Sequence, residues 1–130
     1  MKEETRKRLD KSAHAIRAAR LLLNEGETAF AAGRAYYAMF YAAEALRWEE
    51  GRRARSHSGV HSLFGEQFAR TGRLDSKYHR WMLDAFDQRI EGDYGFCAAH
   101  PPEVVCNLID QVAEFLAAAG AFLSGSESGS

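Results

Sequence analysis

Proline is almost absent from this chain, and that absence constrains its fold more than any other feature. The only two prolines are adjacent, at Pro101 and Pro102, so glycine makes most of the remaining breaks. Between the breaks, alanine, leucine, arginine and glutamate dominate, which is typical of helices. No segment alternates polar and apolar residues for long enough to form a sheet. The sequence therefore predicts an all-α fold, an antiparallel up-and-down bundle of four or five helices.

The helices are expected where apolar residues recur at a helical period. Their approximate ranges are 3–23, 28–50, 56–70, 75–94 and from Pro101 or Pro102 onward. A chain of 130 residues fits one compact core. We expect residues 1–123 to form a single bundle and residues 124–130, which are glycine and serine with one glutamate, to form a flexible tail.

Charge and cysteine content indicate the compartment. The formal net charge of -1 creates no global field toward nucleic acid or a membrane, so any such contact must be local. Cys97 and Cys106 are the only cysteines, and no zinc-site spacing occurs, so we expect neither a disulfide framework nor a metal. The charged N-terminus does not resemble a signal peptide, and no uninterrupted apolar run reaches the roughly 18 residues of a membrane span. We expect a cytoplasmic protein without a transmembrane helix or cofactor.

Two charged residues, Arg89 and Asp93, continue an apolar stripe of the fourth expected helix. At a helical period they share a face with Tyr78, Met82 and Phe86. Burying an unpaired charge is costly, so charges in such places are usually paired, at a subunit interface or in a site. Two interpretations follow: a polar cleft that binds phosphate or a nucleotide, or an Arg–Asp interaction that fixes helix packing.

A basic loop precedes the third expected helix. Arg52, Arg53, Arg55 and His57 lie just before its N-terminus, where side-chain charge and backbone N–H groups can hold a phosphate. The alternative is a solvated loop. His57 and His61 are one turn apart, but no third ligand is evident, so we do not expect a zinc site.

Aromatic residues recur along the second expected helix. Phe30, Tyr37 and Tyr41 fall on one stripe and Phe40 on a second, which predicts a central helix packed on two sides. Tyr36, Tyr37, Phe40 and Tyr41 are candidates for stacking on bases. Aromatic stripes at helical spacing are more often core, so we expect Tyr36 and Tyr37 to support the site from within the bundle.

Three motifs taken together resemble the HEPN family. They are the segment Ala35–Ala43 with its tyrosine pair, His57-Ser58-Gly59, and Arg89 followed by Asp93-Tyr94. HEPN domains are small helical bundles of bacteria and archaea, often encoded beside a minimal nucleotidyltransferase. The resemblance covers nearly the whole chain. It implies an antiparallel bundle, commonly a homodimer, and in many members a metal-independent ribonuclease or its inactive relative within a toxin–antitoxin or defence system.

The chain departs from the active branch of that family, which carries an arginine, four to six residues and then a histidine late in the corresponding helix. After Arg89 come Asp93 and Tyr94, and the next histidine, His100, lies beyond the expected helix end. Cleavage needs a cation to stabilise charge on the phosphate and an imidazole to move the proton of the ribose 2′-hydroxyl. The resemblance therefore leaves open whether this protein is an enzyme.

Three functions are compatible with these features. We expect first a dimeric binding and regulatory module that works with a nucleotidyltransferase or with RNA. The alternative is a metal-independent ribonuclease toxin, in which Arg89 clamps the phosphate and Asp93, Tyr94 or a loop histidine acts as acid or base. The third is a purely structural oligomerisation domain. Tyr94 is also a candidate hydroxyl for modification by the partner, and the alternative is a tyrosine that closes the bundle.

Overall fold

The protein is built from helices, as the sequence predicts. The computed structural model describes residues 1–54, 56–94 and 101–128, and it describes the side chains in these ranges except those of 88–94 and 126–128. These ranges contain no strand. In order, the elements are α1 (Glu3–Asn24), α2 (Thr28–Glu49), α3 (His57–Phe64), a π-helix η1 (Gly65–Ala69), α4 (Lys77–Tyr94) and α5 (Pro102–Ser128).

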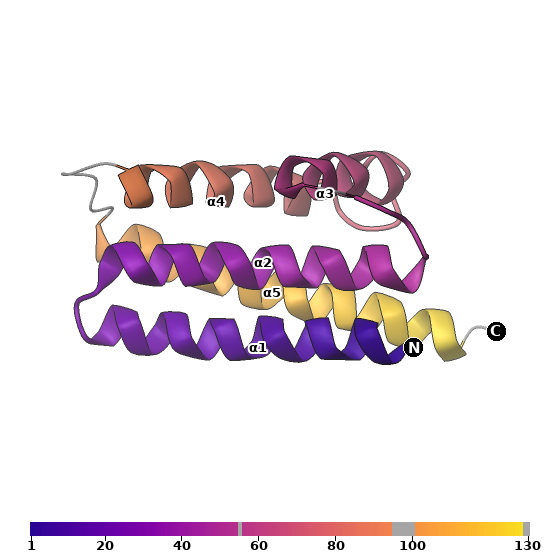
Figure 1. Ribbon diagram of the computed structural model, residues 1–130, viewed down its shortest axis with the longest axis horizontal. Coiled ribbons are helices and arrows are strands. Elements are labelled where there is room, and N and C mark those ends of the chain that lie inside the picture. Colours follow the sequence, from indigo (N-terminus) through magenta and orange to yellow (C-terminus); the bar gives the residue numbers. More distant parts are fainter. Residues whose placement is uncertain (55, 95–100, 129–130) are drawn as a thin grey trace.

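The four long helices alternate in direction (Figure 1). α2 returns antiparallel to α1, α4 returns antiparallel to α2, and α5 runs back in the direction of α2. α3 and η1 form a short helical connection at the end of the bundle where α2 finishes. At the opposite end, α1 and α4 finish and α2 and α5 begin. The predicted antiparallel up-and-down bundle is therefore confirmed.

α2 is the central helix and packs against α1, α3, α4 and α5. Its larger buried side chains are Tyr36, Met39, Phe40 and Leu46, and between them alanines allow the neighbouring helices to approach closely. The buried alanines are Ala31, Ala32, Ala35, Ala38, Ala42, Ala43 and Ala45. Packing on two sides is confirmed, but the place predicted for Phe30 is wrong. Its side chain is 68% exposed, because alanines form the inner side of that turn.

Two polar side chains fix α1 against α2 inside the interface. The hydroxyl of Ser12 donates a hydrogen bond of 2.7 Å to the carbonyl of Ala38, and the hydroxyl of Thr5 donates one of 2.9 Å to Glu49. Both hydroxyl residues are fully buried. Because each buried hydroxyl has a partner on α2, the pairs favour one register of α1 over its neighbours.

α5 closes the core with a continuous buried stripe that includes Val105, Val112 and Phe115. On length and composition alone, Pro102–Gly125 could cross a membrane, with a mean hydropathy of 1.4. Asp110 and Glu114 divide this segment, so it contains no uninterrupted apolar run of that length. Core helices of soluble proteins also meet that criterion, and here a third of the segment is buried inside the bundle. α5 continues as a helix to Ser128, past the start of the predicted tail.

Candidate functional site

The strongest candidate site is a hydrogen-bonded cluster of Tyr36, His57 and His61 where α2 meets α3. The hydroxyl of Tyr36 lies 2.9 Å from Nδ1 of His57 and 3.1 Å from Nε2 of His61. A hydroxyl donates one hydrogen bond and accepts others, so it can donate to one imidazole and accept from the other. Tyr36 is fully buried and His61 is 3% exposed, whereas His57 is half-buried. We call these three residues the histidine cluster.

The local sequence explains why both imidazoles reach the same hydroxyl. The side chain of Ser56 accepts a hydrogen bond of 3.0 Å from the backbone N–H of Gly59, and this cap starts α3 at His57. Residues four apart lie above one another on a helix, so His57 and His61 face α2 together. Of the two serines near this helix start, Ser56 and Ser58, the cap is Ser56.

Aromatic rings hold the histidine cluster in place. The imidazole of His57 is stacked on Phe40, with 4.2 Å between ring centroids. Phe86 of α4 packs 5.2 Å from His61 and 5.4 Å from Tyr36, again between centroids. The cluster is thus fixed by α2, α3 and α4, and its rings have little freedom to rotate away.

Burial keeps His61 uncharged at neutral pH. The pKa of His61 falls from 6.5 to about 4, chiefly because of desolvation, and the neighbouring His57 and His79 contribute in the same direction. A neutral imidazole offers one donor and one acceptor nitrogen. His61 is therefore suited to orienting Tyr36 through a hydrogen bond, and not to taking up a proton or binding an anion by charge.

A cavity of about 430 Å³ opens beside His61. It is lined by Ser58, His61, Ser62, Glu66, His79, Leu83 and Phe86. No sequence pattern singles out His79, which reaches this cavity from α4. The π-helix η1 begins beside it, at Gly65, and such segments occur frequently at functional sites. The cavity adds hydroxyl, carboxylate and imidazole groups next to the histidine cluster.

The face of α4 predicted to be buried is confirmed up to Phe86. Tyr78 is 7% exposed, Met82 is fully buried, and Phe86 contacts the histidine cluster. Arg89 follows Phe86 by three residues on the same helix, which places it on a neighbouring position of that face. α4 also carries Asp93 and Tyr94 in its last turn. The side chains of these three predicted site residues lie outside the described residues.

The residues of the predicted phosphate site in the basic loop do not all lie together. Arg52 and Arg53 line a surface depression of about 600 Å³ beside α3. Arg52 is bonded to Glu50, which also pairs with Arg73, so part of the positive charge there is neutralised. His57 points inward to Tyr36 instead, and Arg55 lies outside the described residues.

Tyr37 joins the histidine cluster from its outer side. Its ring packs edge-on against Tyr36 at 5.3 Å and against His57 at 5.8 Å between centroids. Tyr37 is half-buried, whereas Tyr36 is in the core as expected.

Within the described ranges, no group of three or more His, Cys, Asp or Glu side chains could hold a metal ion. Cys106 is an exposed free thiol, and Cys97 lies outside those ranges.

Comparison with known proteins identifies the family. Residues 5–122 match the HEPN domain. The UPF0332 protein glr0978 of Gloeobacter violaceus is 38% identical over 125 residues, which cover 95% of this chain and 99% of that protein. A UPF0332 protein of Thermotoga maritima is 34% identical over 98 residues, covering 75% of this chain and 74% of that protein.

A third relative carries a functional name. The "Putative toxin MJ0142" of Methanocaldococcus jannaschii is 32% identical over 93 residues, which cover 72% of this chain and 63% of that protein. The family match spans almost the whole bundle, including α2 and α3, which carry the histidine cluster, and α4, which packs against it. The chain belongs to the HEPN domain family.

Proposed function

We propose that this protein is the toxin-like component of a two-protein system, that it binds RNA where α2, α3 and α4 meet, and that a minimal nucleotidyltransferase controls it in the cytoplasm. The observation that carries the proposal is the shared hydroxyl of Tyr36, which holds His57 and His61 beside the face of α4 that Arg89 continues. Two relatives from Methanocaldococcus jannaschii have the word toxin in their names, which supports the toxin-like role.

The residue types at this junction suit a phosphodiester. A guanidinium forms paired hydrogen bonds with phosphate oxygens, and an imidazole exchanges protons near neutral pH. α4 supplies Arg89, and α3 supplies His57. The cation and the imidazole thus come from two helices, whereas the active branch of the family takes both from one helix. His57 is our candidate for the histidine that α4 lacks.

A second candidate function is metal-independent cleavage of RNA. It is favoured by the way His57 is held, through stacking on Phe40 and a hydrogen bond to Tyr36, since a general base must be oriented as well as basic. His57 would take the proton of the ribose 2′-hydroxyl, the 2′ oxygen would attack phosphorus, and the bond to the 5′ oxygen would break. Arg89 would stabilise the charge on the phosphate, and the hydroxyl of Tyr94 would protonate the 5′ oxygen.

Exposed apolar side chains at one end of the bundle support the proposed homodimer. Leu21 is 66% exposed, Phe30 68% and Val104 40%. They lie near the end of α1, the start of α2 and the start of α5, which meet at the end where α4 finishes (Figure 1). Large apolar side chains exposed together are typical of protein interfaces. A second copy bound there would lie close to the segment that carries Arg89.

RNA cleavage by the purified chain separates the two candidates. The assay contains chelator and no added metal, and it compares wild type with Arg89→Ala, His57→Gln and Arg80→Ala, an exposed arginine of α4 that serves as the matched control. A ribonuclease should lose cleavage about 100-fold or more in the first two variants and keep it in the third. RNA binding without cleavage, weakened by Arg89→Ala, supports the binding module. Folded protein that neither binds nor cleaves RNA would contradict both.

Modification by the partner is tested by intact mass. The chain is incubated with the nucleotidyltransferase and a nucleoside triphosphate, together with Tyr94→Phe as the control. We expect wild type to gain the mass of at least one nucleotide and the variant to gain none. An unchanged mass in wild type would count against this form of control.

A further inference from the structure

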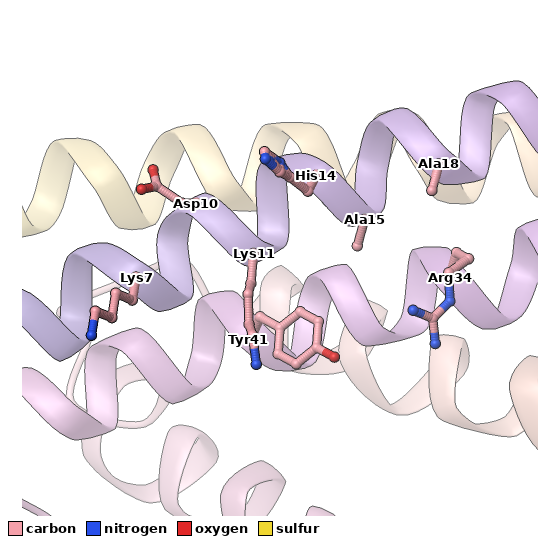
Figure 2. A pocket seen from close by; sticks show the side chains of 8 residues that line it. All are labelled: Lys7, Asp10, Lys11, His14, Ala15, Ala18, Arg34 and Tyr41. Atoms are coloured by element: carbon pink, nitrogen blue, oxygen red, sulfur yellow. The ribbon is translucent and has the colours of Figure 1, made fainter.

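A second polar and aromatic surface lies between α1 and α2, outside the histidine cluster. It is a groove of about 580 Å³, lined from α1 by Lys7, Asp10 and Lys11 and from α2 by Arg34 and Tyr41 (Figure 2). We call it the α1–α2 groove. Small side chains on α1 leave room in it, and its volume lies in the range of ligand-binding sites.

The cations of the groove form a row. Figure 2 shows the charged ends of Lys7, Lys11 and Arg34 along the same side, with the hydroxyl of Tyr41 between the last two. Asp10, the acidic residue among those labelled, points away from this row. The row therefore presents positive charge over several side chains in a protein whose net charge is close to zero.

Two of these cations rest on aromatic rings. Nζ of Lys11 lies 5.4 Å from the centroid of Tyr41, and Cζ of Arg34 lies 4.9 Å from that of Tyr37. An aromatic face attracts a cation without using up its N–H donors. The ion pairs found among the described residues do not include Lys11 or Arg34. Lys7 pairs with the exposed Glu4 at 3.6 Å, and an exposed ion pair of this kind contributes little to stability.

Aromatic rings of α2 connect the groove with the histidine cluster. The ring of Tyr41 lies 6.1 Å from Tyr37 between centroids, and Tyr37 lies 5.8 Å from His57. The guanidinium of Arg34 lies over the ring of Tyr37, which is the middle ring of this row. The rings of Tyr41, Tyr37 and His57 therefore form one row from the groove to the histidine cluster.

We propose that the α1–α2 groove binds the backbone of single-stranded RNA and leads it to the histidine cluster. Phosphates would contact the row of Lys7, Lys11 and Arg34, and a base would stack on Tyr41. Stacking on an aromatic ring together with a basic track is how proteins hold single strands without sequence preference. A duplex keeps its bases stacked inside and could not use the tyrosine. This inference extends the proposed RNA function and rests on it.

Fluorescence anisotropy with a labelled single-stranded RNA tests the groove. An oligonucleotide of about 12 residues covers one such site. The double variant Lys11→Gln/Arg34→Gln is compared with Arg6→Gln/Arg80→Gln, which removes the same charge from exposed positions on α1 and α4. We expect the groove variant to bind about tenfold or more weakly, with a salt dependence reduced by roughly one to two phosphate contacts. Tyr41→Leu should weaken binding about fivefold or more.

The outcomes separate the groove from the histidine cluster. If the groove variant and the control variant bind RNA with equal affinity, the groove is not the RNA-binding site. If His57→Gln alone then loses binding, the histidine cluster is the RNA site. Loss in the groove variants with full binding by His57→Gln and Arg89→Ala would support the groove and overturn the cluster. A duplex of the same sequence that binds as tightly as the single strand would overturn the choice of ligand. Circular dichroism of each variant confirms that it is folded.

Discussion

The hydroxyl of Tyr36 lies 3.1 Å from Nε2 of His61, and both side chains are almost completely buried. The same oxygen lies 2.9 Å from Nδ1 of His57, so one hydroxyl orients two imidazoles. These hydrogen bonds join the middle of α2 to α3 and cross more than 20 positions of sequence. A single oxygen atom therefore contributes to the orientation of both histidines.

Tyr36→Phe should destabilise the protein by removing that oxygen. The substitution preserves the ring packing but leaves nitrogen atoms of His57 and His61 without this partner, and a buried polar group without a partner costs about 1–3 kcal/mol. Urea denaturation followed by circular dichroism gives the change in unfolding free energy. Tyr41→Phe, in a half-buried tyrosine of the same helix, is the control and should change stability by less than about 0.5 kcal/mol. Equal stabilities would show that the hydroxyl contributes nothing.

Stability should fall as the pH drops from 6.5 toward 4. The folded-state pKa of His61 is about 4, below its ordinary 6.5, because its imidazole is desolvated. Between these values the unfolded chain binds a proton that the folded chain does not, so acid favours unfolding. The loss attributable to His61 should be on the order of 2–3 kcal/mol and complete below the folded-state pKa.

The pH dependence is assigned to His61 by comparing variants. Unfolding free energies are measured across this window for wild type, His61→Gln and His14→Gln, in which an exposed histidine is replaced. His61→Gln should flatten the profile, and His14→Gln should not. If wild type and His61→Gln lose stability in parallel, the protonation of another group is responsible.

Gly65→Ala should be costly because of a contact between α4 and η1. A Cβ atom at Gly65 would lie 2.7 Å from Cε1 of His79, so the imidazole or the backbone must move. Overpacking of this kind typically costs about 1–3 kcal/mol. Gly120→Ala is the matched control, since no atom lies within 4 Å of its added Cβ, and it should stabilise α5 by about 0.5–1 kcal/mol.

A double variant tests whether His79 causes that cost. His79→Ala removes the ring that the new Cβ would meet. Gly65→Ala should therefore cost less in the His79→Ala background than in wild type, by about 0.5 kcal/mol or more. An unchanged cost would assign the destabilisation to the backbone of the π-helix instead.

The ends of the helices were predictable because their signals are local. Gly26, Gly51 and Gly72 adopt φ angles of 81°, 67° and 75°, which favour glycine, and each lies in a connection. Ser56 caps α3, and α5 begins at Pro102. Each of these signals acts within a few residues, so the sequence shows it without the tertiary structure.

Contacts between distant segments were not predictable in the same way. The π-helix at Gly65 lies against His79, which belongs to another helix. Periodicity placed Phe30 inside because it counts large apolar residues, whereas close helix packing selected alanines there. His57 and His61 were visible as a pair one turn apart, but their common partner Tyr36 is on a different helix.

The most direct test of the account is an NMR titration of the histidine side chains with single-stranded RNA. The chain has five histidines, so their imidazole signals are few enough to assign by substitution. We predict that RNA shifts the signals of His57 and His61 in wild type, and that Arg89→Ala weakens this response more than Arg80→Ala does. RNA that binds the folded protein while both signals stay unchanged would contradict the proposed site.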